Sequence, residues 1–95
     1  MKYDALMKWL KEEFPHLEWI HSYIRENKCI SVNIGIKTRI IISIRKSKGF
    51  GVDFDNRQYG FCEYPDSLDE LKAVIVKCIK QIDPKLLENV QESLL

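Results

Sequence analysis

Residues 30–54 decide the fold, and they read ISVNIGIKTRIIISIRKSKGFGVDF. Apolar side chains occupy the even positions of segments 30–36, 40–44 and 50–54, whereas most odd positions are small or polar. A period of two is typical of β-strands, because successive side chains point to opposite faces of a sheet. The stretch therefore predicts the inner strands of an antiparallel sheet with one apolar face.

The loops between these strands are predicted from the register. A slip of one residue would set the apolar face of one strand beside the polar face of the next. A three-residue loop at 37–39 avoids this by pairing Ile36 with Ile40, and a second one at 47–49 pairs Ile44 with Val52. Gly49 then occupies the third loop position, where a left-handed backbone is required.

Helical periodicity lies on both sides of the sheet. Apolar residues recur at helical spacing after Asp4, the expected N-cap, until Pro15 ends the helix. Ser67 and Glu70 form a capping box that opens a helix over 68–82. Asp83-Pro84 predicts a short last helix over 84–95.

The remaining segments are shorter. Residues 17–25 fit a helix as well as a strand, but their aromatic and β-branched content favours a strand that turns at 26–28. Tyr59 and Phe61 predict a short fifth strand. The fold class is therefore α+β: an N-terminal helix, a four- to five-stranded antiparallel meander, a long helix and a short C-terminal helix, with the helices on one face. We expect a single domain over residues 1–95.

Composition and net charge limit the classes of protein to which the chain can belong. The chain has 95 residues, a net charge of +1 and 45% hydrophobic residues, which is typical of one globular domain. Dedicated nucleic-acid binders usually carry a marked basic excess. The sequence lacks an apolar run long enough to span a membrane and lacks a leader, and its three cysteines are an odd number. We therefore expect a cytoplasmic protein with reduced thiols.

Catalytic and metal-binding motifs are weak. Asp53 and Asp55 project to one side of a strand, but no histidine stands at ligand spacing, so they are interpreted as solvated edge carboxylates. His16 and His21 stand alone, and Cys29, Cys62 and Cys78 have no second cysteine at ligand spacing. We predict no catalytic residue, no metal site and no cofactor, and we expect a protein that is not an enzyme.

One segment resembles a nucleic-acid-binding signature. Residues 48–54 are similar to the consensus of RNA-recognition motifs, a basic residue followed by alternating glycines and aromatics. Here Phe50, Val52 and Phe54 all lie at even positions, so they belong to one face of the strand. One face cannot both pack in the core and bind RNA. The helix–strands–helix order also loosely resembles double-stranded-RNA-binding domains, but acidic residues replace the lysines at the start of their last helix. A hairpin that supplies core residues explains the segment better.

Two surfaces are predicted to remain exposed. If the helices cover the even face, the odd face presents large aromatics beside small polar residues, as interface centres do. Its candidate partner-binding residues are Trp19, His21, Tyr23, Asn33, Ile41 and Arg45. The equally weighted alternative is that Trp19, Tyr23 and Ile41 pack under the last helix, or that the first strand is reversed so that its aromatics are core. A second surface, the stripe Leu87, Val90 and Leu94, would either fold back on the domain or dock a second copy as a homodimer.

The predicted function is that of a small non-enzymatic protein-binding module, an adaptor, regulator or inhibitor of a larger protein complex. From its small size and its lack of catalytic motifs we expect a bacterial or phage-encoded protein that blocks a larger machine by occupying its surface. The alternative is a nucleic-acid-binding domain whose basic hairpin tips and strand ends contact phosphates through Lys37, Arg39, Arg45, Lys46, Lys48 and Arg57.

Overall fold

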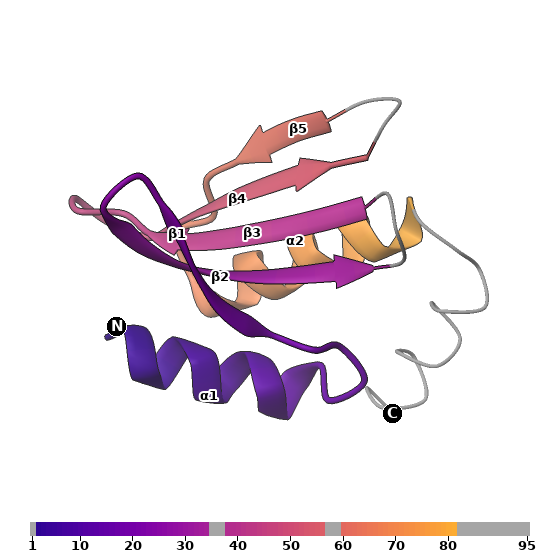
Figure 1. The fold of residues 1–95 in the computed structure, drawn as a ribbon, viewed down its shortest axis with the longest axis horizontal. Helices are drawn as coiled ribbons and strands as arrows, with labels where there is room; N and C mark the ends of the chain where they lie inside the picture. The colour runs from indigo at the N-terminus through magenta and orange to yellow at the C-terminus, as the bar shows by residue number, and fades with distance from the viewer. Residues whose placement is uncertain (1, 35–37, 57–59, 82–95) are drawn as a thin grey trace.

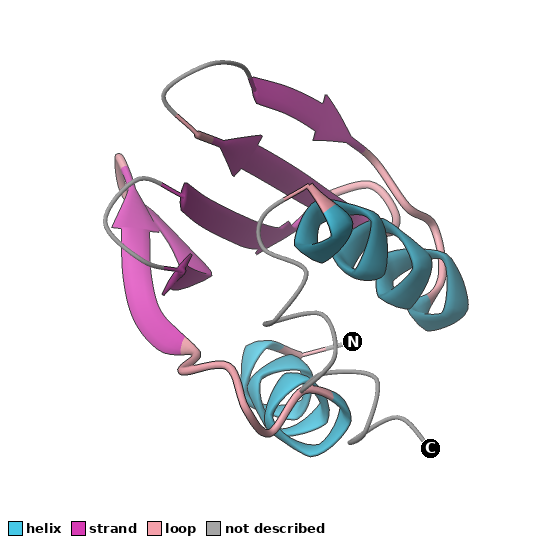
Figure 2. Cartoon of the chain, turned by 90° about the vertical axis from the view of Figure 1, so that its right-hand side faces the viewer, coloured by secondary structure: helices cyan, strands magenta, loops and turns pink. Residues whose placement is uncertain are grey.

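The computed structural model describes residues 2–34, 38–56 and 60–81 and shows two helices and five strands (Figure 1). The sheet is an antiparallel meander in the order β1-β2-β3-β4-β5. Both helices lie on one face of the sheet (Figure 2). The elements are α1 (Tyr3–Glu13), β1 (Ile20–Ile24), β2 (Asn27–Ile34), β3 (Thr38–Ile44), β4 (Phe50–Asp55), β5 (Gly60–Glu63) and α2 (Leu68–Lys80).

This arrangement confirms the predicted α+β fold class, including the choice of a strand for the ambiguous segment near residue 20 and the short fifth strand. The helix predicted over 84–95 lies outside the described residues. None of the described helices is long and apolar enough to cross a membrane.

The two helices differ in how they begin. Ser67 caps α2 by accepting a hydrogen bond from the backbone N–H of Glu70 (3.2 Å), and Glu70 in turn accepts from the N–H of Asp66 (2.9 Å). The two bonds form the predicted capping box. In a standard box the glutamate would accept from the N–H of the N-cap residue Ser67, whereas here it accepts from the N–H of the preceding residue. The prediction for α1 is wrong: its N-cap is Lys2, and Asp4 lies inside the first turn, where its charge faces the positive helix end.

The register of the inner strands corrects the predicted loops. Val32 pairs with Ile40, and Ile42 pairs with Val52. Both predicted loops are therefore misplaced, although the predicted face of each side chain is correct. The loop at 37–39 is wrong because pairing ends at Ile34 and Thr38, and the loop at 47–49 is wrong because the connection spans 45–49. A period of two excludes a register shift by an odd number of residues. A shift by an even number leaves the same side chains on each face, so the alternation cannot detect it.

Gly49 adopts the left-handed conformation that the sequence predicted, with φ of 75°. It closes the β3–β4 connection by accepting a hydrogen bond from the N–H of Arg45 (3.0 Å). The next residue, Phe50, donates its N–H to the carbonyl of Pro65 (2.8 Å), which fixes the start of β4 beside the segment that leads into α2.

The first hairpin reverses the face of β1. The loop between β1 and β2 has two residues, Arg25 with φ of 57° and Glu26, so His21 pairs with Ile30. Directly opposed residues point to the same side of a sheet, so the odd positions of β1 share the helix-covered face with the even positions of β2. The predicted face of this strand is therefore wrong and the reversed face holds, but of the aromatics predicted on it only Trp19 is core, because His21 and Tyr23 remain exposed at the sheet edge.

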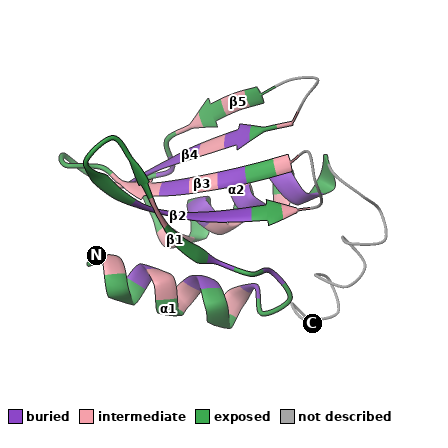
Figure 3. Ribbon diagram, in the orientation of Figure 1, coloured by how far each residue is buried: buried purple, intermediate pink, exposed green. Residues whose placement is uncertain are grey.

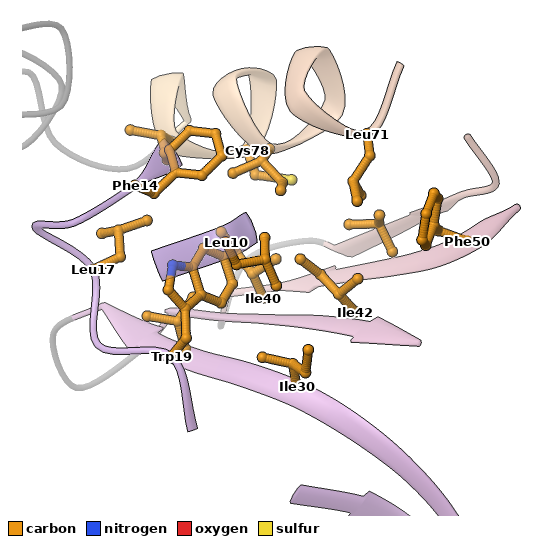
Figure 4. Close-up of a cluster of buried hydrophobic side chains, with 14 of the residues drawn as sticks. Leu10, Phe14, Leu17, Trp19, Ile30, Ile40, Ile42, Phe50, Leu71 and Cys78 are labelled. Atoms are coloured by element: carbon orange, nitrogen blue, oxygen red, sulfur yellow. The ribbon is translucent and has the colours of Figure 1, made fainter. Parts of the chain in front are cut away.

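The core fills the space between the helices and the sheet (Figure 4). The helices contribute Leu6, Leu10, Leu71, Ile75, Cys78 and Ile79, and Phe14 packs beside Trp19 at 6.2 Å between ring centroids. The sheet contributes its even positions: Ile30, Val32, Ile40, Ile42, Phe50, Val52 and Phe54. Each of these side chains is nearly or fully buried, so the even face is the apolar face that the alternation predicted.

Candidate interaction surface

The structure divides the predicted partner-binding residues among three places. Trp19 is only 4% exposed and belongs to the core, so its prediction as a surface residue is wrong. His21 and Tyr23 lie on the helix side of β1, at the sheet edge. Asn33 and Ile41 lie on the opposite face of the sheet, and Arg45 lies in the β3–β4 connection. The six residues therefore do not form one patch.

The sheet face that points away from α1 and α2 is here called the open face. The register assigns to it every second position of each strand: Ile20, Ser22, Ile24, Asn27, Cys29, Ser31, Asn33, Arg39, Ile41, Ser43, Gly51, Asp53, Asp55, Gly60 and Cys62. Neither described helix covers it (Figure 2). The residues in the middle of this face, Ser31, Ser43 and Gly51, are small.

Tyr64 borders the open face beyond β5. A Cβ placed on Gly51 would lie 3.9 Å from the Tyr64 ring, so the ring packs beside this glycine. The guanidinium carbon of Arg45 lies 4.9 Å from the ring centroid, in cation–π geometry. Tyr64 is 62% exposed, so an aromatic ring held in place by an arginine is presented to solvent.

A shallow groove of about 360 Å³ runs over β3, β4 and β5. Arg39, Ile41, Asp53 and Cys62 are among the residues that line it. The Cys62 thiol donates a hydrogen bond to the Asp53 carboxylate (2.5 Å), and this bond raises the pKa of the thiol, with burial and the charge of Asp53 acting in the same direction. A thiol held protonated is a poor nucleophile. The groove thus offers polar contacts rather than an activated cysteine.

The free edge of the sheet at β1 is unusually apolar. Among the described residues, four large hydrophobic side chains are exposed, and three of them lie on β1: Ile20, Tyr23 and Ile24. Figure 3 shows this strand as mostly exposed. Sequence reasoning missed the two isoleucines because it assigned them to the core face. The parity test applied to the other loops would not have revealed them, because it favours a three-residue turn at 26–28 that sets Ile24 opposite Ile30.

The opposite edge of the sheet, at β5, is protected against pairing with another chain. Strand β5 has only four residues, and Glu63 at its end accepts a hydrogen bond from the Lys77 ammonium at 2.6 Å. The same ammonium lies 4.9 Å from the ring centroid of Phe61. Short edge strands and charged side chains discourage pairing with another chain. Strand β1 has neither a charged residue nor a proline.

His21 is part of a structural contact with α1. The Tyr3 hydroxyl lies 2.5 Å from His21 Nδ1 and donates to the carbonyl of Cys29 at 3.2 Å. Burial is the main cause that raises the pKa of Tyr3. Both contacts are satisfied together when His21 Nδ1 carries a proton and donates to the tyrosine oxygen. The pair thereby fastens α1 to the first hairpin.

The basic residues of the nucleic-acid alternative are partly brought together. Lys37 and Arg57 lie outside the described residues. Arg39 pairs across the strands with Asp55, opposite in charge. Arg45, Lys46 and Lys48 border one polar cavity of about 490 Å³, which Asp66 also lines. Asp66 offsets only part of the positive charge of the three basic side chains.

In the segments 2–34, 38–56 and 60–81, no three histidine, cysteine or acidic side chains lie close enough to hold a metal ion. The three cysteines are free thiols, with Cys29 and Cys78 buried and Cys62 exposed.

A comparison of this chain with protein-family models, with curated proteins and with solved structures yields no match.

Proposed function

We propose that the chain is a small non-enzymatic protein-binding module that acts in the cytoplasm as an adaptor, regulator or inhibitor of a larger protein complex. The observation that carries the proposal is the open face: the helices cover one side of the sheet, and the other presents Ile41 and the exposed Tyr64 with its Arg45 support. Tyrosine and arginine are enriched where protein interfaces are strongest.

The chemistry of the remaining polar groups supports a binding role. The thiol of Cys62 is held protonated by Asp53, and His21 is engaged by Tyr3, so the two groups closest to a catalytic type serve structural contacts. Three free thiols favour a reducing compartment, which supports a cytoplasmic site of action.

The experiment uses two surface variants and affinity capture from the native host. Tyr64→Ala removes the ring, and Ile41→Thr removes apolar area while it keeps a strand-forming residue. We expect the double variant to weaken capture at least about tenfold, which corresponds to ~1.4 kcal/mol, with a melting temperature close to that of the wild type. Lys8→Ala is the matched control, because its side chain is 79% exposed on the far side of α1. Unchanged capture by the double variant would contradict the proposal.

A salt titration separates the nucleic-acid alternative. Phosphate contacts release counterions, so binding to a duplex or a single strand weakens steeply between about 50 and 200 mM salt. We expect no such binding. A mobility shift that is lost with rising salt, and that weakens in Lys46→Ala/Lys48→Ala, would favour the alternative.

A further inference from the structure

The edge strand β1 nearly reads the same in both directions. Its sequence is Ile20-His21-Ser22-Tyr23-Ile24, with an isoleucine at each end, an aromatic ring at each next position and a serine at the centre. If a second copy paired with it antiparallel about Ser22, Ile20 of one copy would face Ile24 of the other, and His21 would face Tyr23. A twofold axis through the serine therefore produces two like pairs on each face of the extended sheet.

The backbone of β1 is suited to such pairing. The pair Ile24 and Asn27 closes a two-residue loop, and the closing pair of such a loop exchanges its hydrogen bonds across the hairpin. Hydrogen-bonding direction alternates along a strand, so the N–H and C=O groups of His21 and Tyr23 point to the free edge. These are the groups that the twofold arrangement brings opposite each other.

The side chains agree with the backbone. Ile20 is 43% exposed and Ile24 is 39% exposed, and both lie on the open face. Tyr23 is 57% exposed, and its ring centroid lies 4.7 Å from that of His21. Pairing about Ser22 would cover both isoleucines and extend the aromatic contact across the interface. A slide of two residues in either direction would instead set one isoleucine opposite a serine.

We propose that the protein forms a symmetric homodimer in which the β1 strands of two copies pair antiparallel about Ser22 and join the two sheets into one. The twofold axis stands perpendicular to the sheet, so the open faces of both copies lie on the same side and form one surface. This inference goes beyond the proposed function, which concerns a different protein bound at Ile41 and Tyr64. A contact between two five-residue strands is small, so the dimer is expected to dissociate at concentrations on the order of micromolar.

Sedimentation velocity from about 1 µM to about 1 mM tests the dimer, since the mass should rise with concentration from 11.2 kDa towards twice that value. Ile20→Lys and Ile24→Glu each place a charge opposite an isoleucine at both ends of the interface. We expect each to raise the dissociation constant at least about tenfold, because the two symmetric pairs are lost together.

The double variant Ile20→Lys/Ile24→Glu decides the register. Only pairing about Ser22 brings the new lysine of one copy opposite the new glutamate of the other, and it does so twice. We expect the double variant to dimerise within about threefold of the wild type at low salt and to weaken as salt rises, unlike the wild type. Tyr64→Ala, remote from β1, is the matched control and should leave dimerisation unchanged.

Three results would overturn the proposal. The wild type could stay at 11.2 kDa over the whole range; the single variants could dimerise like the wild type, which would point to another interface such as the stripe Leu87, Val90 and Leu94; or the double variant could fail to recover. Partner capture is measured separately with the Ile41 and Tyr64 variants. A monomer that still captures its partner would therefore refute the dimer and leave the proposed function standing.

Discussion

Replacing Gly49 by alanine tests how the β3–β4 connection is held. Gly49 has φ of 75°, and a Cβ there would lie 2.5 Å from the Pro65 carbonyl oxygen and 2.9 Å from the Asp66 Cα. The left-handed conformation costs an alanine about 1–2 kcal/mol. The backbone at Pro65 must also move, which weakens the hydrogen bond that Phe50 donates to it and adds about 0.5–1.5 kcal/mol.

The reduced freedom of the unfolded chain offsets about 0.4–1 kcal/mol of this. We therefore expect Gly49→Ala to lower the free energy of unfolding by about 2 kcal/mol, a large part of the ~5–14 kcal/mol of a domain this size. In urea denaturation the midpoint should fall by roughly 1 M, given slopes of about 1–3 kcal/mol/M.

Gly51→Ala is the matched control. A Cβ at Gly51 would meet the Ser43 side-chain oxygen at 2.9 Å, and a serine hydroxyl can rotate away where a backbone carbonyl cannot. We expect its free energy of unfolding to stay within about 1 kcal/mol of the wild type. If the Gly49→Ala midpoint were no lower than that of Gly51→Ala, the reasoning from the left-handed conformation and the Pro65 contact would be refuted.

Three further predictions concern the core, alkaline pH and the second helix. Trp19→Ala should destabilise the fold by about 3–5 kcal/mol in thermal or urea denaturation, whereas Tyr23→Ala, at an exposed site, should change it by less than about 1 kcal/mol; similar losses would contradict the placement of Trp19 in the core and of Tyr23 at the exposed sheet edge. Burial raises the pKa of Cys78 from 9.0 to about 12, so the folded state keeps a proton that the unfolded thiol releases. The free energy of unfolding should therefore fall as pH rises from 9 towards 12, and Cys78→Ala should flatten that fall, leaving the contributions of Tyr3 and Cys62, whose pKa values are also raised; an equally steep fall in the variant would assign the effect elsewhere. Ser67→Ala should lower the free energy of unfolding by about 1 kcal/mol through loss of the cap on α2, and a loss well below that in circular-dichroism melts would mean that solvent replaces the serine.

The sequence predicted the fold class because both of its periodicities are strong. Alternation over residues 30–54 identified the apolar face of β2, β3 and β4. Its core residues are Ile30, Val32, Ile40, Ile42, Phe50, Val52 and Phe54, and Ile34 and Ile44 pack against them partly buried. Ser67 and Glu70 located the start of α2 because a capping box is a local interaction between nearby residues.

The errors have a common physical origin. Side chains point to the same face at every second residue, so pairing Ile40 with Val32 instead of with Ile36 keeps each side chain on its face and leaves the alternation unchanged. Only turn geometry distinguishes these registers. The face of β1 depended on whether its turn contained an odd or an even number of residues, which the composition near Arg25 does not determine.

Which residues of β1 belong to the candidate surface depends on whether the turn between β1 and β2 has an odd or an even number of residues. Because the turn has two residues, Trp19 is core and the isoleucines of β1 face outward. The open face itself was predicted correctly on the inner strands, where Asn33 and Ile41 lie. Tyr64 was missed because it follows β5, where no periodic pattern extends, and its exposure depends on the packing of its ring beside Gly51.

The ion pair between Lys72 and Glu13 (2.7 Å) joins two helices that are separated by the whole sheet along the chain. Every strand pairs with its neighbour in sequence, so the hairpins can form as soon as each is synthesised, but the helix layer closes only when α2 has emerged from the ribosome. Until then the isoleucine-rich face stays exposed to chaperones and to aggregation. We therefore expect nascent chains stalled before α2 to be protease-sensitive and to become resistant once α2 is released.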